Sequence, residues 1–253
     1  MGSQNVFGVS FATQTMEELL DELTCGVRPA GSGPRMVFTM NLDHVVTLRR
    51  DERFRHAYER ADVVTADGMP VLVYARLRGA QVSKIAGSDL FAQLMPRLDQ
   101  WRHRCYFVLS RKELGEAMMR HMRARGFPAH RLGYSVPPFG FERSGAASAA
   151  LAARIAAFAP THLFFCVGAP KSEIWCREHT ARIGDAHVLC AGASAEFYLG
   201  VKRRAPTIMQ NTGLEWLWRW GQEPKRLSQR YFVSSWGFVG AIRDDLMRMR
   251  RDD

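Results

Sequence analysis

The stretch "THLFFCVGAP" (161–170) decides the fold, because it is a continuous apolar run that stops at Gly168 and Pro170. A strand buried on both faces is apolar throughout, whereas a strand with one face in water alternates apolar and polar residues. We therefore predict a strand inside a parallel sheet. The following stretch, "SEIWCREHTARIG" (172–184), has the pattern of a helix.

Four more apolar runs lie along the chain, with helix candidates between and around them. The runs are 35–42, 61–68, 105–110 and 186–193, and the other helix candidates are 15–23, 115–126, 144–160 and 238–250. Thr15 and Glu18 fit a capping box at the start of the first helix. Strand–helix alternation predicts an α/β fold with a mainly parallel sheet covered on both faces. Ligands bind such sheets at the carboxyl ends of the strands, where Asn41, Asp67, Ser110, Gly168 and Gly192 are expected.

Charge and pattern divide the chain near Gly200. The 253 residues carry 35 Lys/Arg and 25 Asp/Glu, a net charge of +10, and residues 202–253 hold 11 and 6 of these, which is +5 in 52 residues. We predict an α/β core over 1–200 and a helical, basic and aromatic C-terminal appendage over 201–253. A basic segment favours an anionic partner.

The cysteines and the apolar runs indicate the compartment. The five cysteines form no CxxC pattern, so neither a zinc site nor a dense disulfide framework is expected, and reduced thiols fit a cytoplasm. The opening "MGSQNVFGVSF" has no secretory pattern, and no apolar run reaches about 18 residues. Any membrane contact is therefore expected from one side.

Two strand ends carry candidate side chains for chemistry. Asp67 follows an apolar run and precedes Gly68, which suits a general base or a hydroxyl-binding group. The alternative is an ordinary Asp-Gly turn. In "TMNLDH" (39–44), Thr39 and Asn41 could bind a sugar or nucleotide, or could cap the following helix.

A third loop, "GAPKSE" (168–173), places one lysine at the start of a helix, which is a candidate anion site. The chain has neither a Walker loop nor a GxGxxG motif, which argues against a dinucleotide oxidoreductase. It also lacks DxD, HExxH and GxSxG motifs, so we expect chemistry without a metal or cofactor. The pairs Asp244-Asp245 and Asp252-Asp253 are expected to be solvated.

Several longer segments, taken in order, resemble the WecG/TagA/CpsF glycosyltransferase family (glycosyltransferase family 26) over nearly the whole chain. They are "NVFGVSF", "TMNLDH", "ADVVTADGMPVLVYARLRG", "KIAGSDLF", "GYSVPPFGF", "FFCVGAPKSEIW", "GASAEFYLGVKRRAP" and "GLEWLWRWGQEPKRLSQRY". The resemblance implies a Rossmann-like core with an appendage that covers the active site and associates with membrane. It also implies self-association in some relatives.

The activity that the resemblance implies is inverting, metal-independent sugar transfer. A hexosyl or N-acetylhexosaminyl group would pass from a UDP-sugar to a sugar on a polyprenyl diphosphate, giving a β-linkage. This reaction would serve cell-surface or exopolysaccharide biosynthesis, peripherally on the inner face of the bacterial cytoplasmic membrane.

The resemblance also assigns residues by position. Asp67 matches the proposed catalytic base. Substrate-binding matches are Thr39, Asn41, Gly68, Lys84, Gly168, Lys171, Ser172, Glu173, Gly192 and Glu196. The arginines Arg219, Arg226 and Arg230 would steady a diphosphate, and Trp216, Trp218 and Trp220 suit a membrane interface. Ser172, Lys84 and Glu196 depart from the glutamine, arginine and aspartate common in the family, so we expect an altered sugar preference.

Two other functions remain open from the residues alone. Cations interleaved with aromatics over 211–232 could hold single-stranded nucleic acid, although this leaves Asp67 unexplained. The fold could also serve as a nucleotide-sugar sensor without catalysis. We expect the enzyme, and no nucleic-acid partner.

Overall fold

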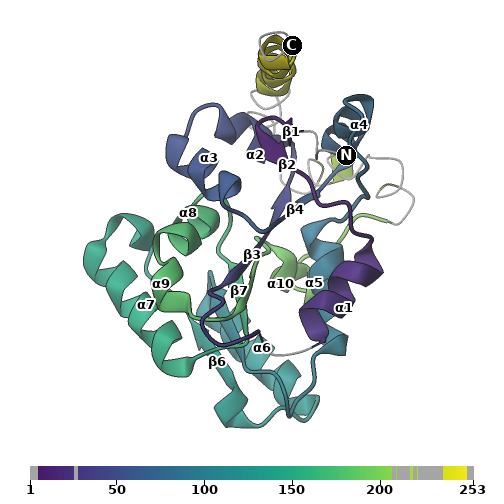
Figure 1. Ribbon diagram of the computed structural model, residues 1–253. Helices are drawn as coiled ribbons and strands as arrows, with labels where there is room; N and C mark the ends of the chain where they lie inside the picture. The colour runs from purple at the N-terminus through teal and green to yellow at the C-terminus, as the bar shows by residue number, and fades with distance from the viewer. Residues whose placement is uncertain are drawn as a thin grey trace.

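A six-stranded sheet lies at the centre of the computed structural model, which describes residues 5–25, 28–206, 209, 217–218, 221 and 236–249 (Figure 1). The strands are β3 (Arg35–Met40), β4 (Val63–Ala66), β5 (Cys105–Leu109), β6 (Leu132–Ser135), β7 (His162–Cys166) and β8 (His187–Cys190). Their order across the sheet is β4-β3-β8-β7-β5-β6, and every neighbouring pair is parallel. The predicted parallel α/β fold is confirmed.

The helices form a layer on each face of the sheet. They are α1 (Met16–Thr24), α2 (Leu42–Leu48), α3 (Glu52–Glu59), α4 (Met69–Leu77), α5 (Gly87–Arg97), α6 (Lys112–Ala124), α7 (Gly145–Phe158), α8 (Lys171–Glu178), α9 (Thr180–Ile183) and α10 (Ser194–Tyr198), with 3₁₀ turns η1 (Ala129–Arg131) and η2 (Phe141–Arg143). One core contains α1, α5, α6 and α10, and the other contains α2, α3, α4, α7 and α8. A short antiparallel hairpin, β1 (Asn5–Val6) and β2 (Val9–Ser10), packs on the second core.

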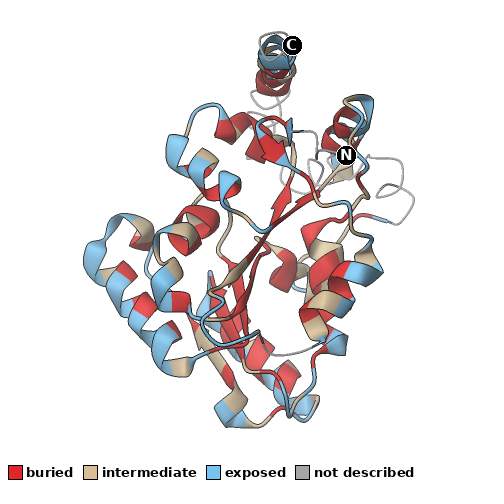
Figure 2. Ribbon diagram, in the orientation of Figure 1, coloured by how far each residue is buried: buried red, intermediate tan, exposed pale blue. Residues whose placement is uncertain are grey.

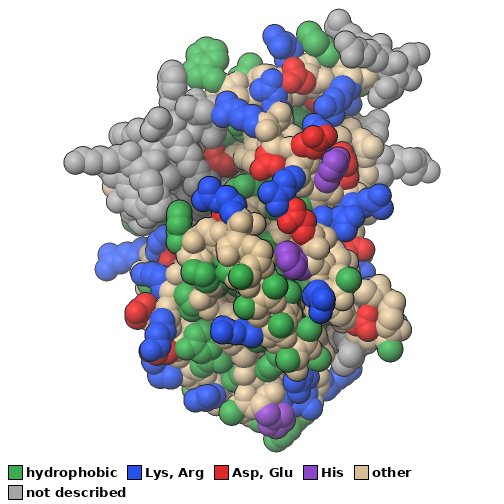
Figure 3. All heavy atoms as spheres, turned by 90° about the vertical axis from the view of Figure 1, so that its left-hand side faces the viewer, with side chains coloured by type: hydrophobic (Ala, Val, Ile, Leu, Met, Phe, Trp, Pro, Cys, Tyr) green, Lys and Arg blue, Asp and Glu red, His purple; other side chains and the backbone are tan. Residues whose placement is uncertain are grey.

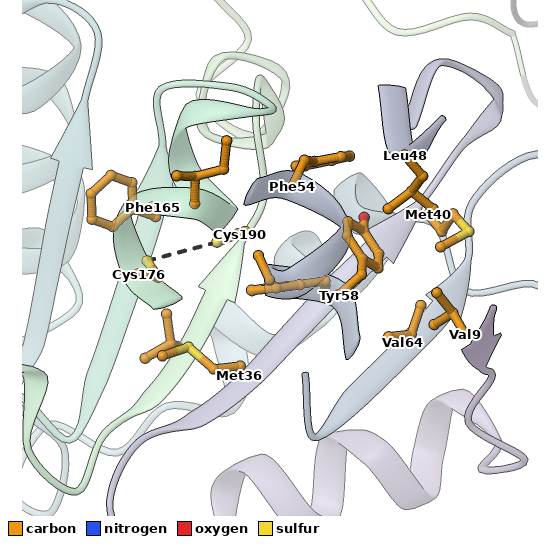
Figure 4. Close-up of a cluster of buried hydrophobic side chains, with 14 of the residues drawn as sticks. Val9, Met36, Met40, Leu48, Phe54, Tyr58, Val64, Phe165, Cys176 and Cys190 are labelled. Carbon is orange, nitrogen blue, oxygen red and sulfur yellow. Dashed lines mark hydrogen bonds between the residues drawn. The ribbon is translucent and has the colours of Figure 1, made fainter. Parts of the chain in front are cut away.

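The surroundings of strand β7 explain why its sequence is apolar throughout. All five of its residues are buried (Figure 2). Phe164 stacks on Phe107 in one core, with ring centroids 4.9 Å apart. Phe165 faces the other core (Figure 4). Its ring centroid lies 5.1 Å from that of Trp175. Successive side chains of a strand point to opposite faces, so a sheet with two covered faces needs apolar residues at every position.

Local sequence signals set the helix starts. The predicted capping box of α1 is confirmed, since Thr15 Oγ1 accepts from Glu18 N–H at 3.3 Å and Glu18 Oε2 accepts from Thr15 N–H at 2.8 Å.

The strand β6 was not predicted, because Gly133 and Tyr134 interrupt its apolar pattern at the edge of the sheet.

Residues 236–249 form a helix, as the sequence predicted, and it packs on the core. The ring centroid of Phe238 lies 5.7 Å from that of Phe7 in the hairpin. The expectation that Asp245 is solvated is wrong: it is 6 % exposed and accepts from Phe7 N–H at 2.7 Å and Tyr74 OH at 2.8 Å. It also pairs with Arg78. These three donors satisfy the Asp245 carboxylate, and this is why it can be buried.

The neighbouring Asp244 forms an ion pair with Arg49, with Nη2 and Oδ2 2.8 Å apart. The pair Asp252-Asp253 lies outside the described residues. The division into a core over 1–200 and an appendage over 201–253 stays a prediction.

Candidate active site

The predicted site residues gather where the strands end. Asp67 follows β4, Asn41 follows β3, Gly192 lies two residues after β8, and Gly168 lies two residues after β7. These four strands are consecutive neighbours in the sheet, so their carboxyl ends share one edge (Figure 1). After β3 the chain enters α2 on one face of the sheet, whereas after β8 it enters α10 on the other face. In parallel sheets, ligands bind where the connections diverge in this way.

Asp67 lies at one end of this edge, directly after the outermost strand β4. Its backbone N–H donates to Met40 O at 2.8 Å, and its Oδ2 accepts from Gly87 N–H at 3.2 Å. Gly68 has φ +98°, a conformation that side chains rarely adopt, and it turns the chain from β4 into α4. The Asp-Gly pair is therefore a turn, and the turn holds the carboxylate against the start of α5.

The start of α5 also approaches Thr39 and Lys84. A Cβ added at Gly87 would lie 2.8 Å from Thr39 Oγ1, so only glycine allows this approach. A parallel bridge pairs Lys84 with Ala66, the residue before Asp67. The fold therefore brings the carboxylate, the hydroxyl of Thr39 and the backbone beside Lys84 into one small region.

Asn41 serves as a helix cap, which was the alternative from the sequence. Its Oδ1 accepts from His44 N–H at 3.1 Å at the start of α2. His44 has a structural role as well, because its Nδ1 lies 2.7 Å from Tyr58 OH.

Tyr58 of α3 joins the polar groups beneath the strand ends. It is 1 % exposed, and its hydroxyl donates to Thr39 O at 3.4 Å. Burial raises the pKa of Tyr58 well above its usual value, and the Glu173 carboxyl adds to this more than the Asp67 carboxyl does. Both carboxyl groups therefore act on the same phenol.

The 168–173 loop turns part of its polar side inward. Gly168 has φ +88°, and Ser172 Oγ donates to its carbonyl at 3.1 Å. Ser172 is 1 % exposed, so this hydroxyl is occupied within the loop. Lys171 lies with its Nζ 6.0 Å from the centre of the Phe139 ring, which is almost fully exposed.

Glu173 is the most unusual group of the site. It is 2 % exposed, and its Oε2 has no hydrogen-bond partner within the described part of the chain. Burial raises the pKa of Glu173 to about 7, and a hydrogen bond from its own backbone N–H opposes this. A carboxyl group with this pKa can accept or donate a proton at neutral pH.

The helix α10 adds an acidic residue held between cations. Glu196 lies 2.7 Å from Arg111 and 2.9 Å from Lys202, with one carboxylate oxygen to each. Gly192, with φ +52°, forms the turn that leads into this helix. Arg111 was missed in the sequence, although its place directly after the apolar run 105–110 marks it as a strand-end residue.

One of the predicted appendage residues, Trp218, lies within the described residues. Trp218 is half-buried, and its Nε1 has no hydrogen-bond partner among the described residues. Trp216, Arg219, Trp220, Arg226 and Arg230 lie outside the described residues.

The described residues contain neither a cluster that could hold a metal nor a membrane-spanning helix. No three His, Cys, Asp or Glu side chains are arranged to hold a metal ion in this part of the chain. None of the helices described is both long and apolar enough to cross a bilayer.

The parallel sheet and the polar groups at its carboxyl edge define an α/β protein of the kind that binds ligands at the strand ends. A model of the glycosyl transferase WecG/TagA/CpsF family matches residues 4–252, nearly the whole chain. The protein belongs to this family, and the resemblance found in the sequence is confirmed. It is a glycosyltransferase of cell-surface glycan synthesis, and the family implies a nucleotide-sugar donor and a lipid-linked acceptor.

Proposed function

We propose that the protein is an inverting, metal-independent transferase that moves a hexosyl or N-acetylhexosaminyl group from a UDP-sugar to a sugar on a polyprenyl diphosphate. The product carries a β-linkage and enters cell-surface or exopolysaccharide biosynthesis. The position of Asp67 carries the proposal, because this carboxylate stands at the carboxyl edge of the sheet, against the start of α5. The lack of a DxD motif supports a metal-independent reaction.

Asp67 acts as the general base in this mechanism. Its carboxylate takes the proton from the acceptor hydroxyl as that oxygen bonds to the anomeric carbon. The bond from the anomeric carbon to the UDP oxygen breaks at the same time, and UDP leaves with the electron pair. This single displacement inverts the configuration at the anomeric carbon.

The other residues bind the two substrates. Thr39, Asn41 and Gly68 contact the donor sugar, and the nucleotide-side residues are Gly168, Lys171, Ser172, Glu173, Gly192 and Glu196. Lys84 neutralises phosphate charge, and Arg219, Arg226 and Arg230 steady a diphosphate. Because Lys84 cannot offer the planar fork of arginine, and because the Ser172 hydroxyl is occupied, the sugar preference differs from that of the family pattern.

We place the enzyme peripherally on the inner face of the cytoplasmic membrane. The helix over 236–249 exposes Trp236 by 68 % and Val239 by 59 %. Figure 3 shows hydrophobic side chains beside Lys/Arg and some Asp/Glu side chains at the top of the molecule, where this helix lies in Figure 1. A surface that combines interfacial aromatics with cations suits anionic lipid. The sequence before this helix adds three more tryptophans, Trp216, Trp218 and Trp220. Self-association stays an open alternative.

Transfer from a panel of UDP-sugars to a short-chain prenyl-diphosphate sugar, with EDTA present, tests this proposal. We expect the wild type to turn over with a subset of donors. Asp67→Asn should lose about 10²–10⁴-fold in kcat while it retains donor binding, because the amide cannot accept the proton. Asp185→Asn, a change at the opposite edge of the sheet, serves as the control.

Four results would contradict the proposal. If transfer requires a divalent cation, the reaction is not metal-independent. If Asp67→Asn keeps full activity, Asp67 is not the general base. Donor binding without turnover in the wild type favours a sensor, while salt-sensitive binding to single strands favours a nucleic-acid protein.

A further inference from the structure

An apolar groove runs between α4 and the helix over 236–249. It encloses about 370 Å³ and is lined chiefly by Met69, Pro70, Val73, Leu77, Phe238 and Ile242. Two of its residues are strongly exposed, Val73 by 46 % and Leu77 by 79 %. A continuous exposed apolar surface on a folded protein marks a binding site more often than isolated apolar residues do.

The groove begins next to the proposed catalytic base. Met69 and Pro70 are the first residues of α4, two and three residues after Asp67. Three residues of chain span at most about 10 Å. The nine residues of α4 then extend about 13 Å to Leu77, at 1.5 Å per residue. The groove therefore leads away from the base along a single helix.

Buried contacts hold the second wall of the groove in place. Asp245 binds Tyr74 of α4, Arg78 directly after that helix, and the backbone N–H of Phe7. Gly237 packs so closely on α2 that a Cβ there would lie 2.7 Å from Val46 Cγ1. The groove is therefore formed before any ligand binds.

We propose that this groove holds the first isoprenyl units of the lipid-linked acceptor while the acceptor sugar lies at Asp67. The inference rests on the proposed function and adds a subsite for the lipid. An isoprenyl chain has no hydrogen-bonding groups, and the groove side chains of Val73, Leu77 and Ile242 offer none in return. The sugar and diphosphate then occupy the short distance between Asp67 and the start of the groove.

Two soluble acceptors test the subsite, with the same sugar diphosphate joined to farnesyl or to ethyl, below micelle-forming concentration and without vesicles. We expect the wild type to show at least a tenfold lower KM for the farnesyl acceptor. The double variant Val73→Gln/Leu77→Gln should lose this preference while kcat and the KM for the ethyl acceptor stay unchanged. Both residues are exposed, so the variant should fold. Trp101→Gln, at a 65 % exposed tryptophan elsewhere, is the matched control.

The outcomes separate the subsite from the function. Equal use of both acceptors by the wild type, or a farnesyl preference that survives in the double variant, overturns the groove and leaves the transferase intact. A variant that keeps the preference but loses vesicle binding shows a bilayer contact instead, and one that only becomes monomeric shows a subunit interface. No transfer to either acceptor by the wild type overturns both proposals.

Discussion

At the scale of single residues, Glu173 is the group whose chemistry depends most on its surroundings. It lies in the first turn of α8, 2 % exposed and without an ion pair in the described part of the chain. Removing an ionised carboxylate from water costs free energy unless a cation or enough donors replace the water. This cost raises the pKa of Glu173 to about 7.

Glu173→Gln should change the pH dependence of stability. The folded state binds the proton more tightly than the unfolded state, so the wild type loses stability as the pH rises from about 4.5 through about 7. The variant lacks this loss. Its free energy of unfolding relative to the wild type should therefore be higher at pH 8 than at pH 5, by an amount that approaches about 3 kcal/mol. Urea unfolding of both proteins at pH 5, 6, 7 and 8 measures it.

The control for this change is Glu178→Gln. Glu178 lies in the same helix but is exposed and paired with Arg53. Parallel stability profiles for the wild type and Glu173→Gln would show that the carboxyl group is solvated or paired in solution.

At the scale of elements, the amino ends of the strands carry a cluster of buried histidines. His162 begins β7 and His187 begins β8, paired in register, with ring centroids 5.3 Å apart. His103, before β5, lies 4.7 Å from His162. Burial lowers the pKa of His162 to about 3 and that of His187 to about 4, and it also lowers the pKa of His103.

This cluster should make the fold sensitive to acid. As the pH falls from about 6.5 towards 4, the unfolded chain binds protons that the folded chain excludes, so stability is lost. His187→Gln should reduce the loss, by up to about 3 kcal/mol at pH 4. Thermal unfolding at pH 7, 5.5 and 4.5 checks this, with the exposed His130→Gln as control. Equal acid sensitivity in all three proteins would rule out His187 as a cause.

The helix over 236–249 depends on one buried carboxylate. Asp245→Ala would leave Arg78, which is 14 % exposed, without its partner, and this typically costs about 3–5 kcal/mol. We expect faster hydrogen exchange in this helix and a lower Tm. Asp244→Ala removes the more exposed pair with Arg49 and should cost about 1 kcal/mol or less. Equal effects of the two changes would mean that burial does not distinguish the pairs.

At the scale of the whole molecule, charge and exposed apolar surface act together. The net charge is +10, and half of it lies in the last fifth of the chain. The helix in this region also exposes Trp236 and Val239. Electrostatic attraction brings such a surface to anionic lipid, and apolar contacts keep it there.

Vesicle binding should therefore depend on lipid charge and on salt. We expect the full chain to sediment with anionic vesicles at low salt and to be released near 1 M KCl, where the Debye length is about 3 Å. Deletion of 201–253 should abolish binding and most transfer. An active truncation that still binds vesicles would contradict this. Near-UV circular dichroism is the control for folding, because the deletion uncovers Phe7 and Tyr74.

The sequence alone determined the sheet and the edge where the site lies. Five of the six strands of the sheet were predicted, because burial on both faces requires apolar runs that are visible without a structure. The strand β6 lacks such a run. The helices α3, α4, α5 and α10 were not predicted, and α2 was considered only as the helix that Asn41 could cap. Asp67, Gly168 and Gly192 were placed by one rule, since parallel strands end at one edge. The Thr15 cap was also predictable, because its partner is three residues away.

Only the tertiary structure decided the environment of these groups. The approach of Gly87 to Thr39 joins residues 48 positions apart, and the contact of Asp245 with Phe7 spans 238. The burial of Glu173 likewise depends on neighbours from other elements. Hydrogen bonding and dielectric screening act through space, and so pKa values and occupied hydroxyl groups follow from packing. Local sequence patterns report which side of an element is buried, but not which distant side chain lies against it.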